Sequence, residues 1–120
     1  ATAEAKVHHS SREQVHFHEV GAVDAIVDIC LASCLMDLLN PQKIYSSPIP
    51  VGSGSVHCEH GEMPVPAPAT LELLKNLPSC GFDLVSERAT PTGVALLRAW
   101  QVDFSSRGAA ITRNVGYGMG

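Results

Sequence analysis

Residues 23–39, VDAIVDICLASCLMDLL, carry the clearest structural signal in the chain. Asp24 lies in the first turn, where the helix dipole favours an anion, and Asn40-Pro41 ends the segment with a residue that caps a helix and one that cannot continue it. We therefore expect a helix over 23–39 whose apolar stripe is buried. The stripe follows the i, i+3, i+4, i+7 spacing of one helix face and consists of Val23, Ile26, Val27, Cys30, Leu31, Cys34, Leu35 and Leu38.

The segments around this helix predict an α+β fold. Two further helices are expected, at 69–77 and from Thr90-Pro91 onward, and residues 1–8 are typical of the last turns of another. The second of these helices should turn Val94, Leu97 and either Trp100 or Gln101 inward. The expected strands and helices together predict a mixed sheet of about four to five short strands covered by three helices, with a layered α/β arrangement as the alternative. The expected strands are 15–20, 43–47, 53–58, 82–86 and 111–115.

Length and composition indicate one domain over residues 1–120. Apolar residues make up 45% and charged residues 17%, and the net charge is −4, so neither disorder nor a basic surface for nucleic acid or anionic membrane is expected. Pro48 and Pro50 interrupt the longest uncharged stretch, so no membrane span is expected. The four cysteines are too few and too irregularly spaced for a disulfide scaffold, so we expect reduced thiols in a cytoplasm. Because Ala1 stands where an initiator Met would, we interpret the chain as an excised portion of a longer protein.

The six histidines are confined to residues 8–60. In His16-Phe17-His18-Glu19, strand alternation places both imidazoles on one side, and imidazole is the commonest neutral ligand of nickel, zinc, copper and iron. A carboxylate such as Glu19 can join them or orient a ring. Two histidines on an edge strand are equally common as surface residues, so both interpretations stay open.

Two acids follow this motif. Asp24 and Asp28 are four residues apart on one helix face, where like charges repel each other. A bound cation or a basic partner would account for the pair, whereas two solvated carboxylates would simply tolerate the repulsion.

A second cluster of potential ligands is His57-Cys58-Glu59-His60. In a strand, Cys58 and His60 share one face, and a thiolate beside an imidazole suits a late transition metal. The chain has neither a Cys-x-x-Cys pair nor a His-Glu-x-x-His motif, so a structural zinc site and a zincin-type hydrolase are not indicated.

The start of the last expected helix is a candidate anion site. Thr90-Pro91-Thr92-Gly93 offers backbone N–H groups, two hydroxyls and a glycine, which are the components of a phosphate site formed by Thr90, Thr92 and Gly93. The same residues would cap any helix, so this alternative also stays open.

Several longer strings resemble one family. They are VHFHEVGAVD at 15–24, IVDI at 26–29, YSSPIPVGSG at 45–54, CEHG at 58–61, PVPAPAT at 64–70 and TPTG at 90–93. They cover nearly the whole chain and are similar to the nickel-pincer cofactor biosynthesis family, the nickel-inserting chelatase (cyclometallase) of lactate racemase maturation. The chain is shorter than members of that family and corresponds to an internal fragment of their N-terminal part.

The resemblance implies nickel insertion into pyridinium bisthiocarboxylic acid mononucleotide, a CTP-dependent lyase-class reaction. It places CTP and its divalent metal in a C-terminal part outside this chain, so we expect this fragment to capture or deliver nickel without the complete activity. It also implies a lactate racemase-type apoenzyme as a partner. A homo-oligomer is a further expectation for the chain. Residues at family-motif positions are His8, His16, His18, Glu19, Asp24, Asp28, Cys58 and His60, whereas His57 and Glu59 depart from the motif.

Two other functions are compatible with the residues alone. A metal-dependent hydrolase of phosphate esters would need an open metal position and a base, for which Glu19 is the candidate. A structural or oligomerisation domain would bind no metal. Nickel binding, and its dependence on His16 and His18, would separate these functions.

Overall fold

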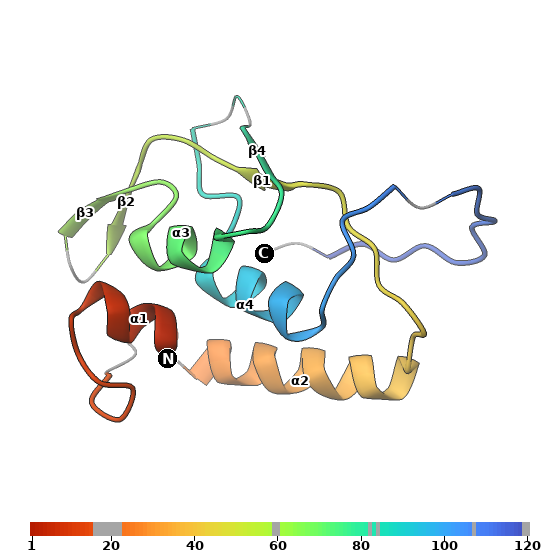
Figure 1. Ribbon diagram of the computed structural model, residues 1–120, viewed down its shortest axis with the longest axis horizontal. Helices are drawn as coiled ribbons and strands as arrows, with labels where there is room; N and C mark the ends of the chain where they lie inside the picture. The colour runs from red at the N-terminus through yellow and green to blue at the C-terminus, as the bar shows by residue number, and fades with distance from the viewer. Residues whose placement is uncertain (16–22, 59–60, 82, 84, 107, 119–120) are drawn as a thin grey trace.

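In the computed structural model, the described residues are 1–15, 23–58, 61–81, 83, 85–106 and 108–118. They form helices and short strands of both pairing types, which confirms the α+β class. Figure 1 shows α2 along the bottom, α4 above it, then α3, with the β1–β4 pair at the top. In chain order the elements are α1 Thr2–Val7, α2 Val23–Leu39, β1 Ile49–Val51, β2 Ser55–Cys58, β3 Gly61–Pro64, α3 Pro68–Leu74, β4 Ser79–Gly81 and α4 Pro91–Ala99.

The four strands form two pairs. β1 and β4 are parallel, with Ile49 opposite Ser79 and Val51 opposite Gly81. Parallel neighbours need a long crossover connection, and here it runs through the β2–β3 hairpin and α3. β2 and β3 are antiparallel, with Cys58 opposite Gly61 across the turn.

The core lies where the β1–β4 pair meets α3 and α4. Ile49, Leu74, Ala89 and Val94 are buried together there, and Val94 is only 1% exposed. Leu97 and Phe104 pack against this cluster from the end of α4 and the segment after it. The core therefore fixes α4 in the centre of the fold, between α2 and α3.

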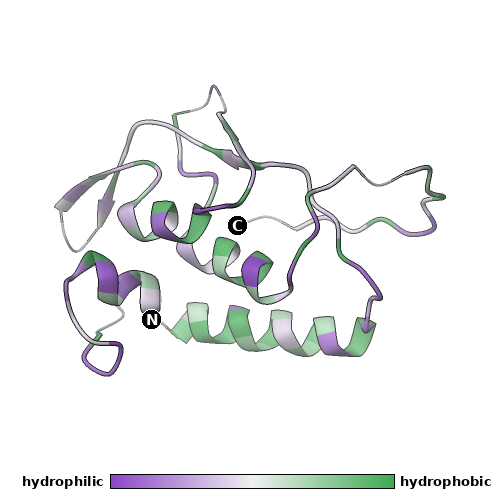
Figure 2. Ribbon diagram, in the orientation of Figure 1, coloured by the Kyte–Doolittle hydropathy of each residue, from purple (hydrophilic) through white to green (hydrophobic). Residues whose placement is uncertain are grey.

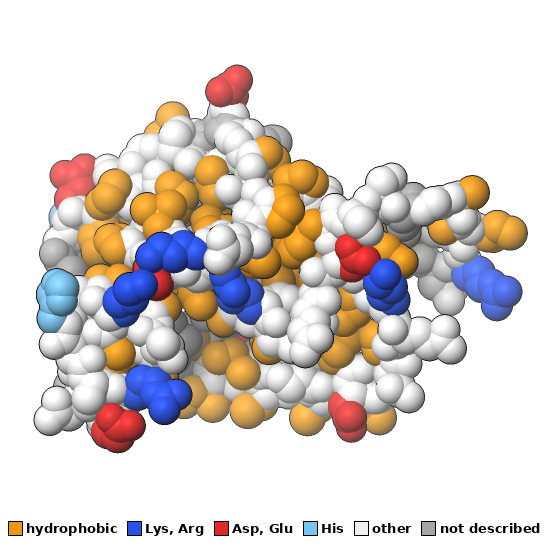
Figure 3. Space-filling view, viewed as in Figure 1, with side chains coloured by type: hydrophobic (Ala, Val, Ile, Leu, Met, Phe, Trp, Pro, Cys, Tyr) orange, Lys and Arg blue, Asp and Glu red, His pale blue; other side chains and the backbone are white. Residues whose placement is uncertain are grey.

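Polar contacts join the outer helices to this core. Lys6 of α1 donates to Glu72 of α3 over 2.5 Å, and Lys75 donates to the same carboxylate. These two hydrogen bonds hold the pKa of Glu72 below its ordinary value. Figure 3 shows the basic and acidic side chains gathered where α1 meets α3. The Arg98 guanidinium of α4 donates to the backbone carbonyls of Leu73 and Lys75, so α3 is joined to both neighbouring helices.

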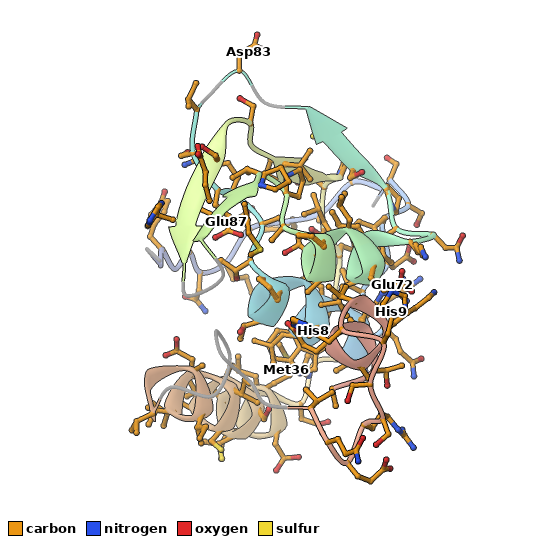
Figure 4. The ribbon with its side chains drawn as sticks, turned by 90° about the vertical axis from the view of Figure 1, so that its left-hand side faces the viewer. His8, His9, Met36, Glu72, Asp83 and Glu87 are labelled. Carbon is orange, nitrogen blue, oxygen red and sulfur yellow. The ribbon has the colours of Figure 1, made fainter. Side chains whose placement is uncertain are left out.

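The bounds expected for α2 are confirmed, but the burial of its predicted stripe is wrong. Leu31 is 57% exposed and Leu38 81% exposed, and the rest of the stripe is exposed as well. The half-buried residues are Ala25, Ile29 and Ala32, with Met36 on the side of α2 that faces α4 (Figure 4). Apolar residues occur on every side of α2 (Figure 2), so the sequence pattern did not identify the inner face, which combines two alanines with Ile29 and Met36.

The remaining element predictions have mixed outcomes. The helical residues expected at 1–8 and the helix start expected at Thr90-Pro91 are confirmed by α1 and α4. The expected helix 69–77 is α3, which ends earlier, at Leu74. The strand 53–58 is confirmed as β2, and its hairpin partner β3 was not expected. The strand 15–20 falls almost entirely outside the described residues.

Three predicted strands are wrong. In 43–47 a single bridge joins Tyr45 to Asp103, and the strand expected at 82–86 occurs earlier, as β4. Residues 111–115 have no strand, and Ile111 is 91% exposed. Composition indicated strands at these places, but a strand also needs an extended partner. The segment 43–47 pairs with Asp103 at one bridge only, and the described residues of 111–115 have no strand partner.

Among the cysteines whose side chains the structure describes, Cys30, Cys34 and Cys80 are free and exposed. Over the described part of the chain, no helix combines the length and the apolar character that crossing a membrane requires.

The Asp103 carboxylate is held by hydrogen bonds beside the bridge between Tyr45 and Asp103. Lys43 Nζ lies 2.7 Å from Asp103 Oδ2, and the Ser105 N–H donates to Asp103 Oδ1 over 2.7 Å. The same Asp103 joins two backbone segments, since its N–H donates to the carbonyl of Ile44 and its carbonyl accepts from the N–H of Ser46. The hydrogen bond from Lys43, and after it the hydrogen bonds from Ser105, hold the pKa of Asp103 well below its usual range.

Asp103→Asn should reduce the acid sensitivity of the fold. Because the pKa of Asp103 is lower in the folded state than in the unfolded state (about 3.9), its contribution is present above about pH 5 and is lost as the pH falls toward the folded-state value. We expect the melting temperature to fall less between neutral pH and about pH 3 in the variant than in the wild type. Circular dichroism melts measure this difference. Asp83→Asn, at an exposed loop carboxylate, is the control, and an Asp103→Asn profile parallel to the wild type would contradict the assignment.

Candidate functional site

The start of α4 is the part of the predicted site that the structure describes completely. Thr90 is the N-cap residue, and its Oγ1 accepts a hydrogen bond from the Gly93 N–H over 3.2 Å. Val94 donates its N–H to the Thr90 carbonyl, and Pro91 has no N–H. Thr92 is thus left to offer its N–H and its hydroxyl to an anion, so the cap has less donor capacity than the sequence suggested.

The three predicted phosphate ligands face two different cavities. Thr90 and Gly93 line a cavity of about 360 Å³, together with Arg88 and Ser46. Thr92 lines a second cavity of about 460 Å³. The structure therefore keeps Thr90 and Gly93 together but places Thr92 at a different cavity, and Arg88 joins the first two in the lining.

The larger cavity lies between α1, α2 and α4. One face of α4 forms a wall, because Thr92, Ala95, Leu96, Ala99 and Trp100 repeat at helical spacing. Ile29 and Ser33 of α2 and the beginning of α1, including Glu4, form the other walls. Its lining is predominantly apolar with a few polar groups, and its volume is within the range of about 300–1,000 Å³ that is typical of small-molecule sites.

Most predicted metal ligands lie outside the described residues. This applies to His16, His18, Glu19 and His60. Asp24 is placed in the first turn of α2 and Cys58 at the end of β2, but the positions of their side chains are not among those described. Within the described ranges, no three His, Cys, Asp or Glu side chains converge on a point that could hold a metal ion.

The described candidates are dispersed over the surface. Asp28 is exposed on α2. His8 is exposed at the end of α1, with its Nε2 3.5 Å from Glu4 Oε2, and it lies beside His9 in Figure 4. His57 is exposed on β2 opposite Glu62. Within the part of the chain that the structure describes, none of these side chains lies in a cluster of potential metal ligands.

The elements that flank the two histidine motifs nevertheless share one side of the molecule. The first motif is followed by the beginning of α2, and the second begins with His57 and Cys58 at the end of β2 and is followed by β3. Figure 1 shows the beginning of α2 and the connected ends of β2 and β3 on the side of the molecule where α1 lies. The cavity between α1, α2 and α4 is bordered by two of these elements.

Three residues of the cavities had not been recognised as site candidates. Arg88 and Glu4 carry no local motif, so only the fold places them beside a cavity. Trp100 was one of two alternatives expected on the inner face of α4, and its spacing from Thr92 and Leu96 was the available signal. The structure places this half-buried indole at the cavities, not in the buried core cluster.

Comparisons with known proteins agree on one family. A family profile described as "Nickel insertion protein" matches residues 1–120. A "Pyridinium-3,5-bisthiocarboxylic acid mononucleotide nickel insertion protein" of Acetivibrio thermocellus is 48% identical over 122 residues, and one of Clostridium acetobutylicum is 50% identical over 120 residues. Both alignments cover 100% of this chain, but 30% and 29% of the respective relatives. No solved structure matches the chain.

Proposed function

The chain belongs to the nickel insertion protein family, and from that premise we propose that it captures Ni²⁺ and delivers it for insertion into pyridinium-3,5-bisthiocarboxylic acid mononucleotide. The observation that carries the proposal is the family match over the entire chain, together with relatives of about half-identical sequence whose names state this substrate. The chain spans about 30% of the length of those relatives. We therefore assign nickel capture and delivery to it, and the complete reaction to the longer protein.

The proposed nickel ligands come from the two histidine motifs and the acids beside them. Imidazole and thiolate donors hold Ni²⁺ firmly, and neutral imidazoles can be exchanged when a substrate offers two softer sulfur donors. This exchange gives a physical route from a capture site to a thiocarboxylate ligand. The proposed set is His16, His18, Glu19, Asp24, Asp28, Cys58 and His60.

The proposed phosphate contacts lie at the start of α4. Thr90 and Gly93 share a cavity with Arg88, whose guanidinium can bind a phosphate in a bidentate manner. Thr92 retains a backbone donor and a hydroxyl on the neighbouring face. We assign the mononucleotide phosphate to this turn.

Other parts of the proposal concern the longer protein. They are a lyase-class, CTP-dependent insertion with a second divalent metal, a cytoplasmic location, and transfer of the finished cofactor to a lactate racemase-type apoenzyme. The net charge of −4 is unfavourable for nucleic acid as a competing partner.

Equilibrium dialysis of the chain tests nickel capture. The chain is dialysed separately against Ni²⁺, Zn²⁺, Co²⁺ and Mn²⁺ at neutral pH, where histidines are largely deprotonated and available as ligands. We expect one Ni²⁺ to be retained per chain and Mn²⁺ to be retained least, as the order of divalent-metal affinities requires. Absence of stoichiometric nickel would refute the proposal.

A further inference from the structure

The cavity between α1, α2 and α4 has the size of a ligand site. Its volume is about 460 Å³, and its walls come from three helices that are separate in the sequence. The alanines Ala95 and Ala99 create the space, because they stand on the same face of α4 as Leu96 and Trp100 and fill less of it. A cavity formed by small residues between large ones can accept a flat ring.

Trp100 gives this cavity an aromatic wall. It is the single tryptophan of the chain and the C-cap residue of α4. The buried core cluster contains Ile49, Leu74, Ala89 and Val94, and Trp100 is not among the hydrophobic residues packed against that cluster. Trp100 instead lines this cavity, the cavity at the start of α4, and a third cavity of about 350 Å³ that Met36 and Ile44 also line. A large aromatic side chain left half-buried at a cavity is suited to stack on a ligand.

Glu4 gives the wall of the cavity a negative charge. It contributes to the wall from α1, and its side chain is 16% exposed. His8 Nε2 lies 3.5 Å from the Glu4 carboxylate. Within the described lining, Glu4 is the one residue with an acidic or basic side chain, and Ala1, which carries the α-amino group of the chain, also lines the cavity. A carboxylate and an indole face both attract a cation, the latter through the ring quadrupole.

We propose that this cavity binds the N-ribosylated pyridinium ring of a mononucleotide, with the ring stacked on Trp100 and its positive charge facing Glu4. This inference rests on the proposed function, which supplies a pyridinium mononucleotide as the substrate class. Thr92 lies eight residues before Trp100 on the same helix, about 12 Å away along the axis at 1.5 Å per residue. The ring therefore lies at the C-terminal end of α4, and the ribose extends toward Thr92.

Fluorescence of the single tryptophan tests the proposal directly. The chain is titrated with nicotinamide mononucleotide, a pyridinium mononucleotide without sulfur, and with uridine monophosphate, whose ring is uncharged. We expect saturable quenching by the first nucleotide, with an affinity about tenfold higher than for the second. Equal affinities, or quenching that does not saturate, would overturn the proposal.

Variants test the position of the ring by calorimetry, which does not need the indole. Trp100→Leu and Ala99→Leu should each weaken nicotinamide mononucleotide binding about tenfold, through loss of stacking and filling of the cavity. Trp100→Phe should retain most of the affinity. Ala110→Leu, at an exposed loop position, is the matched control for added volume and should bind as the wild type does. If Ala99→Leu binds the nucleotide like the wild type while its circular dichroism spectrum is unchanged, the ring is not in this cavity.

Nickel dialysis on the same samples separates this inference from the proposed function. Retention of nickel by Trp100→Leu together with loss of nucleotide binding supports the cavity. Retention of nickel by a wild-type chain that does not discriminate between the two nucleotides refutes the cavity and leaves nickel capture intact. Loss of nickel from the wild type refutes the proposed function, whereas the nucleotide titration still decides whether the cavity prefers a pyridinium ring.

Discussion

Replacing both His16 and His18 by alanine should weaken Ni²⁺ binding about 100-fold or more. The double variant removes two imidazole nitrogens from the proposed ligand set. The variant keeps Cys58, His60 and the carboxylates, but it loses two of the three proposed imidazoles, and a site with fewer imidazole donors binds Ni²⁺ less firmly. Calorimetric titration at about neutral pH, where imidazole is largely neutral, measures the change in dissociation constant.

The matched control for this variant removes two other imidazoles. His9 and His57 are both exposed, at the end of α1 and on β2, and neither belongs to the proposed ligand set. His9→Ala/His57→Ala should bind nickel within about twofold of the wild type, because exposed histidines outside a site add only weak, independent binding. Equal losses in the two double variants would mean that nickel binds to surface histidines without a defined site.

Gly52→Ala should destabilise the fold by about 3 kcal/mol or more. Gly52 follows β1, and a Cβ built at this position would lie 1.6 Å from the backbone carbonyl oxygen of Ser86. No contact of this length exists, so one of the two backbone segments must move. The segment with Ser86 leads to Ala89 of the core and to the start of α4. The displacement should therefore also weaken the proposed phosphate contacts. Urea denaturation followed by circular dichroism measures the free energy of unfolding.

Gly81→Ala is the control because Gly81 ends β4, opposite Val51, one residue from Gly52. A Cβ at Gly81 would meet nothing within 4 Å. Its free energy of unfolding should stay within about 0.5 kcal/mol of the wild type or increase slightly, since alanine lowers the entropy of the unfolded chain. If Gly52→Ala were as stable as Gly81→Ala, the close approach between β1 and the Ser86 segment would be wrong.

Local signals predicted the helices well. The N-cap hydroxyl of Thr90 and the proline after it identified the start of α4, and Asn40-Pro41 identified the end of α2, because caps depend on a few neighbouring residues. Which face of α2 is covered depends on the distant elements that meet it. The stripe of Leu31 and Leu35 was therefore assigned to the interior, whereas Ala25 and Ile29 face inward.

Strands and cavities depend more strongly on distant contacts. β1 is a strand because Ser79–Gly81 lies beside it, and no residue near Pro50 in the sequence predicts that pairing. The metal motifs could be recognised because their residues are close in the sequence. Glu4, Ile29 and Trp100 meet only when three helices pack together, so the cavity could not be predicted from spacing alone.

X-ray absorption spectroscopy at the nickel edge, on the chain loaded with one Ni²⁺, tests nickel capture most directly. The proposed ligand set predicts multiple scattering from at least two imidazole rings and a sulfur scatterer from Cys58. The imidazole features should weaken to those of a single ring, from His60, in His16→Ala/His18→Ala and persist unchanged in His9→Ala/His57→Ala. A nickel ion surrounded only by oxygen atoms in the wild-type chain would contradict the account.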